Sequence, residues 1–394
     1  MKKNNILLIT QYFPPDFFAT GKVMEELAED LAIAGNDVLV LTGRTLSHQR
    51  KSRYKEKVRV KRIYYLHFSK DRKIGRILNF LSFPFFIFLH LPTLLRYKNY
   101  VIVSNPPTAV IIGALMNICF GKRIFYILQD IYPDIAVHLG YLSPASLLAN
   151  FMKVLNHFAF DRLERIILLS EDMKKYFNSH YSKWQSKVLV ISNWADADKL
   201  LPLAKYNDFS IKYGFHDRFI ILYSGNIGLF QDFEILINAA EQLQKREEIL
   251  FLFVGEGSAK KNLQKIVMEK SLINVRFLTY VDDEDYSKLL AASDVQIITL
   301  KKGVENFGFP SKFYSYLRSK RPIISITSRE SELGCIILEN NIGFVCKNAD
   351  EFANSIEKLM ENEDLRKTFG EKARQLLLKE FDRKIVTRKY LEFF

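Results

Sequence analysis

The sequence predicts an α/β protein built from two Rossmann-like domains that face each other across a cleft. The chain has 394 residues, which is too long for one ordinary domain and long enough for two. Its composition, 48% hydrophobic and 26% charged, is that of a globular protein. Strand-like apolar runs alternate with helical segments from end to end, which is the pattern of parallel βαβ units.

The first half contains the strands and helices of one complete sheet. In the first helix, Val23, Leu27 and Leu31 fall on one face, and Gly35 with Asn36 ends it. Further helices are expected over the aromatic segment 77–95, from about 108, up to Leu163 and after Ser170. The expected strands cover residues 5–10, 37–43, 58–68, 100–104, 123–128, 165–170 and 187–192.

The second half repeats this alternation. Helices are expected to end at Lys245, Lys270 and Ala292, and the chain is expected to be helical after Asp350. The expected strands cover residues 218–225, 249–257, 274–281, 295–300, 321–326 and 343–348.

Between the halves, residues 192–210 have little periodicity and are interpreted as a linker. We therefore expect an N-terminal domain over 1–194, a C-terminal domain over 195–380, and a last segment, 381–394, that crosses back to the first domain. A ligand site is expected in the cleft, at the carboxyl ends of the strands.

The cysteines and the amino terminus indicate a reduced, cytoplasmic setting. Cys119, Cys335 and Cys346 form no C-x-x-C pair, so neither a disulfide framework nor a zinc site is predicted. The opening "MKKNNILLITQYFPP" has an apolar run of only four residues, which fits a first strand and is too short for a signal peptide core.

The positive charge is concentrated in one region. Between Arg44 and Lys98 there are 15 Lys and Arg against two acidic residues, which accounts for the whole net charge of +13. The region surrounds segment 77–95, which has no charged residue but is interrupted by polar residues and prolines. We interpret this segment as lying on a membrane surface, with the basic residues on anionic lipid. The alternative is a buried core helix beside a solvated basic loop.

Two other interpretations of the basic region are disfavoured. A transmembrane span would put neighbouring strands of one sheet on opposite sides of the membrane. Nucleic-acid binding would require aromatic residues interleaved with basic ones, whereas here they cluster with aliphatic residues.

The usual nucleotide motifs are missing. The first strand is not followed by G-x-G-x-x-G, "GEGSAK" at Gly255 lacks the third glycine, and there is no Walker A motif. Glycines do occur at strand-to-helix turns, where backbone N–H groups could bind a diphosphate. They are Gly21 in the first half, and Gly225 with Gly228 in the second. Each alone is compatible with a simple tight turn.

The stretch "ENFGFPSKF" resembles the retaining nucleotide-sugar glycosyltransferases of the GT-B fold, the family 4-like group whose second domain carries an E-x(7)-E element. The resemblance extends to "QYFPP", "FLFVGEG", "LLAASDVQIITL" and "RPII". The stretches "QDIYPDIAVHLG" and "PSKFYSYL" are similar to a branch that builds bacterial surface polysaccharides on lipid carriers.

The resemblance assigns donor-binding roles in the second domain. Glu305 matches the first motif glutamate, near the donor sugar, and the backbone amides of Asn306, Phe307 and Gly308 would bind sugar hydroxyls. The second glutamate, which would hold the ribose, falls on Phe313 and is missing. Its role is left to a group such as Tyr314 or Glu256.

The cations expected after the first strand of this domain are also missing, since Asn226 and Gln231 stand there. Lys312, which follows Ser311, is then the best remaining cation for the diphosphate, together with the turn at Gly225 to Gly228 and the start of its own helix. The alternative is a solvated first-turn lysine.

Three residues of the first domain are candidates for the acceptor side. Asp130 and Asp134 follow the strand 123–128 and could orient or deprotonate an acceptor hydroxyl, and His138 could contact the donor sugar or its phosphate. Helix capping and a structural histidine are the alternatives. Ser170 with Glu171 indicates a helix cap.

The resulting hypothesis is a retaining hexosyl- or N-acetylhexosaminyl-transferase. It would move a sugar from a UDP- or GDP-linked donor to a polyprenyl-diphosphate-linked glycan in O-antigen, capsule or exopolysaccharide synthesis, at the inner face of the cytoplasmic membrane. No cofactor or metal is expected, since "DAD" at Asp196 lies in the linker and "DDED" at Asp282 opens a helix. The rivals are a non-catalytic nucleotide-sugar-binding or assembly subunit and, less favoured, a sugar-nucleotide epimerase.

Overall fold

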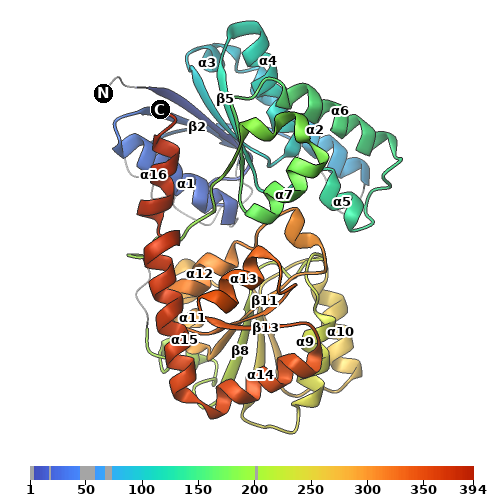
Figure 1. The fold of residues 1–394 in the computed structure, drawn as a ribbon, viewed down its shortest axis with the longest axis vertical. Coiled ribbons are helices and arrows are strands. Elements are labelled where there is room, and N and C mark those ends of the chain that lie inside the picture. Colours follow the sequence, from blue (N-terminus) through green and yellow to red (C-terminus); the bar gives the residue numbers. More distant parts are fainter. Residues whose placement is uncertain (1–3, 17–18, 45–57, 67–72, 200–202) are drawn as a thin grey trace. The chain divides into compact units, whose positions relative to one another are not determined.

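The computed structural model describes residues 4–16, 19–44, 58–66, 73–199 and 203–394 (Figure 1). The chain forms two compact units. The first comprises Met1–Asn193, Asn306–Phe309 and Val386–Phe394, and the second comprises Trp194–Glu305 and Pro310–Ile385.

The first unit is built on a parallel sheet of seven strands. The strands pair in the order β3-β2-β1-β4-β5-β6-β7, and the pairing begins with Asn5 opposite Asp37. The expected alternation is confirmed, although β3 ends at Ile63 where the apolar run had predicted a strand to Phe68; residues 67 and 68 lie outside the described residues. The strands are β1 (Asn5–Thr10), β2 (Asp37–Gly43), β3 (Arg59–Ile63), β4 (Asn99–Val103), β5 (Arg123–Leu128), β6 (Arg165–Leu168) and β7 (Val188–Val190).

Two long helices expected in this unit are each divided. The segment 77–95 forms parts of α2 and α3, because Pro92 has no N–H and so starts a new helix. The helix expected to end at Leu163 is replaced by α5 and α6, since Gly140 adopts φ +73° and Ser146 caps a fresh helix. The helices are α1 (Ala19–Ile33), α2 (Lys73–Phe88), α3 (Leu91–Leu95), α4 (Val110–Phe120), α5 (Asp134–His138), α6 (Leu147–Phe160) and α7 (Glu171–His180).

The last residues of the chain pack into the sheet of the first unit. The rings of Phe393 and Phe394 lie 5.2 Å and 5.0 Å from that of Phe125 on β5, and Tyr390 is buried. Tyr390 belongs to α16 (Arg383–Leu391), and the two phenylalanines follow this helix.

The second unit has a parallel six-stranded sheet with helices on both sides (Figure 1). The strands pair in the order β10-β9-β8-β11-β12-β13, and every residue of β8 and β9 is buried, as expected for central parallel strands covered on both faces. The strands are β8 (Phe219–Ser224), β9 (Ile249–Val254), β10 (Val275–Leu278), β11 (Val295–Thr299), β12 (Ile323–Ile326) and β13 (Gly343–Cys346).

One core holds the sheet and helices of this unit together. It joins Phe251 and Phe253 of β9 to Leu236, Leu263 and Phe352 of three covering helices. The helices are α8 (Asp208–Lys212), α9 (Glu234–Gln242), α10 (Lys260–Glu269), α11 (Asp283–Ala292), α12 (Lys312–Arg318), α13 (Glu332–Glu339), α14 (Ala349–Glu361) and α15 (Glu363–Leu376).

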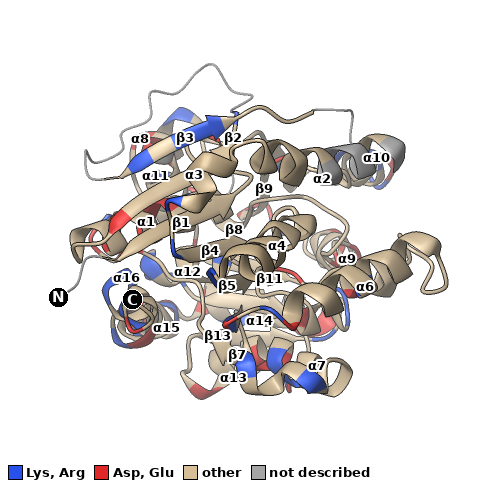
Figure 2. Ribbon diagram, turned by 90° about the horizontal axis from the view of Figure 1, so that it is seen from above, with Lys and Arg blue, Asp and Glu red and all other residues tan. Residues whose placement is uncertain are grey.

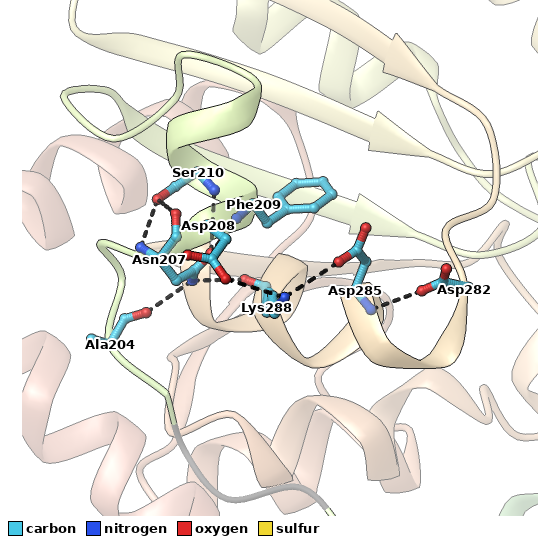
Figure 3. Close-up of polar contacts among 8 residues, drawn as sticks. All are labelled: Ala204, Asn207, Asp208, Phe209, Ser210, Asp282, Asp285 and Lys288. Atoms are coloured by element: carbon cyan, nitrogen blue, oxygen red, sulfur yellow. Dashed lines mark hydrogen bonds and ion pairs between the residues drawn. The ribbon is translucent and has the colours of Figure 1, made fainter.

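The short helix α8 is tied to α11 by Asn207 (Figure 3). The Asn207 side chain accepts from the backbone N–H groups of Phe209 and Ser210, and the Ser210 hydroxyl accepts from the Asn207 N–H at 2.9 Å, which completes a capping box. Asn207 Nδ2 also donates to the carbonyl of Lys288 at 3.1 Å. A helix of five residues has little stability of its own, so contacts such as this one hold it in place.

Candidate donor site

The sheet of the second unit reverses its strand order between β8 and β11. From β8 the chain runs outward to β9 and β10, and it returns to place β11 on the other side. Loops that leave the carboxyl ends at such a point diverge, and α/β proteins bind ligands there. The segments that follow β8, β9 and β11 are 225–233, 255–259 and 300–311.

Glycines at this edge allow two turns to pack backbone against backbone. Gly225, Gly255 and Gly257 have φ values of +129°, +150° and +158°. A Cβ on Gly255 would lie 1.9 Å from the carbonyl oxygen of Gly225, and one on Gly257 would lie 2.2 Å from that of Ile227. Only glycine fits at these positions. The close packing of the two turns is enough to explain why glycine is needed there, before any ligand is considered.

Most amides of the turn at Gly225 to Gly228 are already hydrogen-bonded. Gly225 donates to the Val254 carbonyl and Ile227 to that of Glu256, both at 2.9 Å. Gly228 donates to Gln231 Oε1 at 3.1 Å. Within the described chain, the N–H of exposed Asn226 is the one left for a ligand.

The side chain of Lys312 lies against the same turn. Its Nζ is buried 3.3 Å from the centre of the Tyr223 ring, and a Cβ on Gly225 would lie 3.4 Å from it. No described residue accepts a hydrogen bond from this nitrogen, and burial holds the pKa of the Lys312 ammonium well below its usual range. The structure thus places Lys312 with Gly225 and does not leave it as a solvated first-turn lysine.

The position of the missing second glutamate is part of the hydrophobic core. Phe313 has no exposed surface and its ring meets those of Tyr314 and Phe381 at 5.5 Å and 5.6 Å. Tyr314 is itself 2% exposed. Of the two groups considered as replacements, Glu256 is therefore the accessible one, with about half of its side-chain surface exposed (49%).

Lys260 supports Glu256, and sequence reasoning missed it. Its Nζ donates to Glu256 Oε1 at 2.6 Å and to the carbonyls of Gly255 and Leu278 at 2.8 Å and 3.2 Å. The spacing of four residues from Glu256 to Lys260 at a helix start was the available signal.

Glu305 and Ser311 flank the rest of the motif. Glu305 lies in a short 3-10 turn, Val304–Asn306, half-buried, and its carboxylate makes no hydrogen bond or ion pair with the described residues. Ser311 is exposed before α12 and its side chain does not cap that helix.

In the first unit, Asp130 lies beside Gly308. The two residues form an isolated antiparallel bridge, and a Cβ on Gly308 would lie 2.8 Å from Asp130 Oδ1. Burial raises the pKa of the Asp130 carboxyl to about 6. Phe307 lies in the same cluster, with its ring 5.1 Å from that of His138 and 4.6 Å from that of Tyr176.

Asp134 is held by two tyrosines that sequence reasoning did not find. Tyr176 donates to Oδ1 at 3.0 Å and Tyr181 to Oδ2 at 2.6 Å. Burial, with the Asp134 charge as a second cause, raises the pKa of both phenols. The two tyrosines come from the α7 region, so only the tertiary structure brings them to Asp134.

Gly21 lies in the first turn of α1 rather than in the turn before it. It is buried, and a Cβ there would lie 3.3 Å from the backbone of Tyr12 and Phe13. Close approach of helix and loop accounts for the glycine.

The described residues contain no cluster of three or more His, Cys, Asp or Glu able to hold a metal ion. The three cysteines are unpaired thiols. No helix in the described part of the chain combines the length and hydrophobicity needed to cross a membrane.

Comparison with known proteins agrees with this arrangement. Residues 207–376 match the family described as Glycosyl transferases group 1. The chain is 25% identical over 287 residues to the "Probable glycosyltransferase WbjE" of Pseudomonas aeruginosa, which covers 72% of this chain and 71% of that protein. It is also 25% identical to WcaI of Escherichia coli (strain K12), a glycosyl transferase assigned to colanic acid biosynthesis, over 84% of each chain.

Solved structures show the same fold over nearly the whole chain. Sucrose-phosphate synthase from Thermosynechococcus elongatus superposes with a TM-score of 0.80 at 16% identity, covering 99% of this chain and 98% of that one. Anabaena HepE in complex with UDP gives 0.73 at 16% identity, covering 99% of each chain. The fold is therefore that of the GT-B glycosyltransferases. The family match over residues 207–376 and the named relatives support a glycosyltransferase activity for this chain.

Proposed function

We propose that this glycosyltransferase transfers a hexose or N-acetylhexosamine, with retention of anomeric configuration, from a UDP- or GDP-linked donor to a polyprenyl-diphosphate-linked glycan. The observation that carries the donor part is the buried amine of Lys312, which lies beside Gly225 and donates a hydrogen bond to none of the described residues. Structural neighbours crystallised with UDP and with UDP-glucose support a nucleotide-sugar donor. A relative named for colanic acid biosynthesis supports a surface-polysaccharide product.

The proposed chemistry is electrostatic. Transfer breaks the bond from the anomeric carbon to the diphosphate, and negative charge develops on the departing diphosphate. Lys312, once protonated, stabilises that charge together with the Asn226 N–H. Glu305, with the amides of Asn306, Phe307 and Gly308, holds the sugar hydroxyls. None of these steps requires a metal ion.

Glu256 is the group we assign to the ribose hydroxyls in place of the missing second glutamate. Its carboxylate is exposed, and Lys260 fixes one of its oxygens at 2.6 Å, which leaves the other free to accept. We also assign Ser311 to the donor site, because it directly precedes Lys312 in the motif.

Asp130 is the proposed base for the acceptor hydroxyl. A pKa near 6 lets the carboxylate be ionised at neutral pH and still accept a proton readily. We also assign Asp134, fixed by two tyrosines, and exposed His138 to the acceptor side.

We further propose that the first unit rests on the inner face of the cytoplasmic membrane. On α2, Phe83 and Ile87 are buried whereas Phe85 and Phe88 are 62% and 46% exposed. On α6, Leu147 is 89% exposed. Figure 2 shows basic residues along β3, whose Arg59, Lys61 and Arg62 belong to the region 44–98; residues 45–57 and 67–72 of that region lie outside the described chain. Exposed apolar groups beside basic ones suit an anionic lipid surface.

Binding and transfer assays test this proposal. A thermal-shift screen of UDP- and GDP-sugars should show one ligand that, at 100 times its dissociation constant, stabilises the protein by about 2.7 kcal/mol. That donor should be transferred to a polyprenyl-diphosphate glycan with unchanged activity in EDTA, and NMR of the product should show the anomeric configuration of the donor.

Other outcomes select the rivals. Donor binding without transfer to any lipid-linked acceptor would favour a non-catalytic subunit. Conversion of the donor in the absence of acceptor would favour an epimerase. Inversion at the anomeric carbon would contradict the retaining mechanism.

A further inference from the structure

The side-chain nitrogen of Lys312 lies in an environment that does not favour a positive charge. Its Nζ is buried, and its near neighbours are the face of the Tyr223 ring and the backbone of Gly225. An ammonium taken from water normally recovers its solvation through hydrogen bonds to acceptors. None of the described residues offers one here, and the attraction of a cation to a ring face repays only part of that cost.

The ring beneath Lys312 is itself fixed. Tyr223 is fully buried between Phe233 and Phe253, and its hydroxyl donates to the Asn226 carbonyl at 2.6 Å. Because the Tyr223 side chain is held in this way, a small rotation of it cannot bring its hydroxyl to Lys312 as a hydrogen-bond acceptor.

The other titratable groups around this turn do not neutralise the lysine. The described residues give Lys312 no carboxylate partner, and burial is the cause that lowers its pKa. Glu305, which precedes α12, makes no ion pair with it, and Glu256 is paired with Lys260. Three tyrosines also lie near this turn: Tyr316 on α12, Tyr280 after β10 and Tyr286 on α11.

We propose that Lys312 is an uncharged amine in the free protein and takes up one proton from solution when the diphosphate of a nucleotide sugar binds beside it. This inference rests on the donor role proposed above and adds that donor binding is coupled to protonation. The incoming diphosphate brings negative charge and hydrogen-bond acceptors to an amine that lacks both, which favours the ammonium form. The proton moves from buffer to Nζ, and no other bond is made or broken.

The coupling has a defined sign. Binding raises the proton affinity of Lys312, so affinity for the donor must fall as pH rises between the pKa of the free amine and that of the bound amine. For one linked proton the change is about tenfold per pH unit. A nucleotide sugar is a good probe, because its diphosphate is esterified at both ends and does not itself titrate near neutral pH.

Calorimetry measures the proton directly. UDP-glucose, or the nucleotide sugar that the thermal-shift screen selects, is titrated at pH 7.5 in PIPES, HEPES and Tris, whose ionisation enthalpies differ. The wild type should take up close to one proton per ligand. Lys312→Arg, whose guanidinium stays charged, should bind without uptake, and so should Lys312→Met, with weaker affinity. Lys261→Met, which changes an exposed lysine of α10, should behave as the wild type.

A second measurement does not depend on donor binding. In protein carrying lysine labelled with ¹³C at Cε, one NMR signal should titrate well below the others, vanish in Lys312→Arg, and shift its titration upward with the nucleotide sugar. Titration of every lysine near pH 10 to 11 would overturn the inference, as would normal donor binding without proton uptake. If the low-titrating signal is present but no nucleotide sugar binds or alters it, the donor role and its coupling fail together, and the buried amine alone remains.

Discussion

Phe313 stands where the family resemblance predicts a carboxylate, and its environment explains why none could be there. The side chain is fully buried against Tyr314 and Phe381, so a glutamate at this position would carry its charge into the core. The replacement of the motif glutamate by Phe313 therefore has a structural consequence: the side chain at position 313 is part of the core that stabilises the second unit.

Substituting Phe313 should therefore act on stability. Phe313→Ala should lower the free energy of unfolding by about 3 to 5 kcal/mol, the range for a large buried aromatic residue. Phe313→Glu should be at least as harmful and should not improve donor affinity. Urea unfolding checks both, with exposed Phe85→Ala as the matched control. A stable Phe313→Glu that binds donor more tightly would show that the position faces the ligand.

Lys312 should contribute mainly to catalysis. If its ammonium stabilises the departing diphosphate, Lys312→Met should lower kcat on the order of 10² to 10³, the range for loss of one preorganised charge-stabilising group. Lys312→Arg should restore part of the rate, since the charge returns in a different shape. Steady-state transfer assays on variants with native melting temperature measure this, with Lys261→Met as control. Near-normal turnover of Lys312→Met would mean that the diphosphate does not bind at Lys312.

The raised pKa of Asp130 predicts a pH-dependent stability difference. A carboxyl whose folded pKa is about 6 lies above its unfolded value of about 3.9, so the folded state binds its proton more tightly. This contribution is complete below about pH 4 and is lost as pH rises through 6. Asp130→Asn should therefore gain stability relative to the wild type between pH 4 and 7, by at most about 3 kcal/mol. The free energy of unfolding of both proteins is measured as a function of pH. A difference between them that stays constant from about pH 4 to 7 would contradict the raised pKa of Asp130.

At the scale of elements, short helices in the second unit depend on side chains that reach other elements. Asn207 caps α8 and bonds to the Lys288 carbonyl on α11, whereas Asp208 reaches Lys288 Nζ only across an exposed ion pair at 3.4 Å (Figure 3). These neighbours in sequence should contribute very differently to stability.

Asn207→Ala should cost about 1 to 2 kcal/mol of unfolding free energy, because it removes an N-cap and strands buried backbone groups. Asp208→Ala should cost less than about 1 kcal/mol, as expected for an exposed pair. Chemical denaturation of the two variants beside the wild type makes the comparison. Equal losses would mean that the ion pair contributes as much to stability as the cap, which would contradict the proposed role of Asn207.

At the scale of the whole molecule, the proposed contact with a lipid surface rests on the net charge of +13 and on the exposed aromatic side chains of α2. In the segment 77–95, Phe83 and Ile87 are buried, as a core helix requires, whereas Phe85 and Phe88 are exposed. Contact of these exposed rings with lipid stays a prediction.

Binding to vesicles should have a salt-sensitive and an apolar part. The protein should sediment with anionic vesicles at low salt. Added salt should release part of it, because salt screens the attraction of the basic residues to the lipid, which contributes roughly 1 kcal/mol per residue to binding. Phe85→Ser with Phe88→Ser should weaken the salt-resistant part without unfolding the protein, whereas Phe83→Ser should unfold it. Equal binding to neutral and anionic vesicles would remove the electrostatic part of the proposal.

The sequence determined the fold class, because continuous apolar runs such as those of β8 and β9 are local features that compel burial on both faces of a parallel sheet. It also made candidates of Lys312, through the motif, and of Asp130, through its place after the strand 123–128. The tertiary structure alone decided that the Lys312 amine lies on the Tyr223 ring, and that two tyrosines hold Asp134. Such contacts join elements far apart in the chain, and they depend on how helices pack on the sheet, which no local pattern of residues encodes.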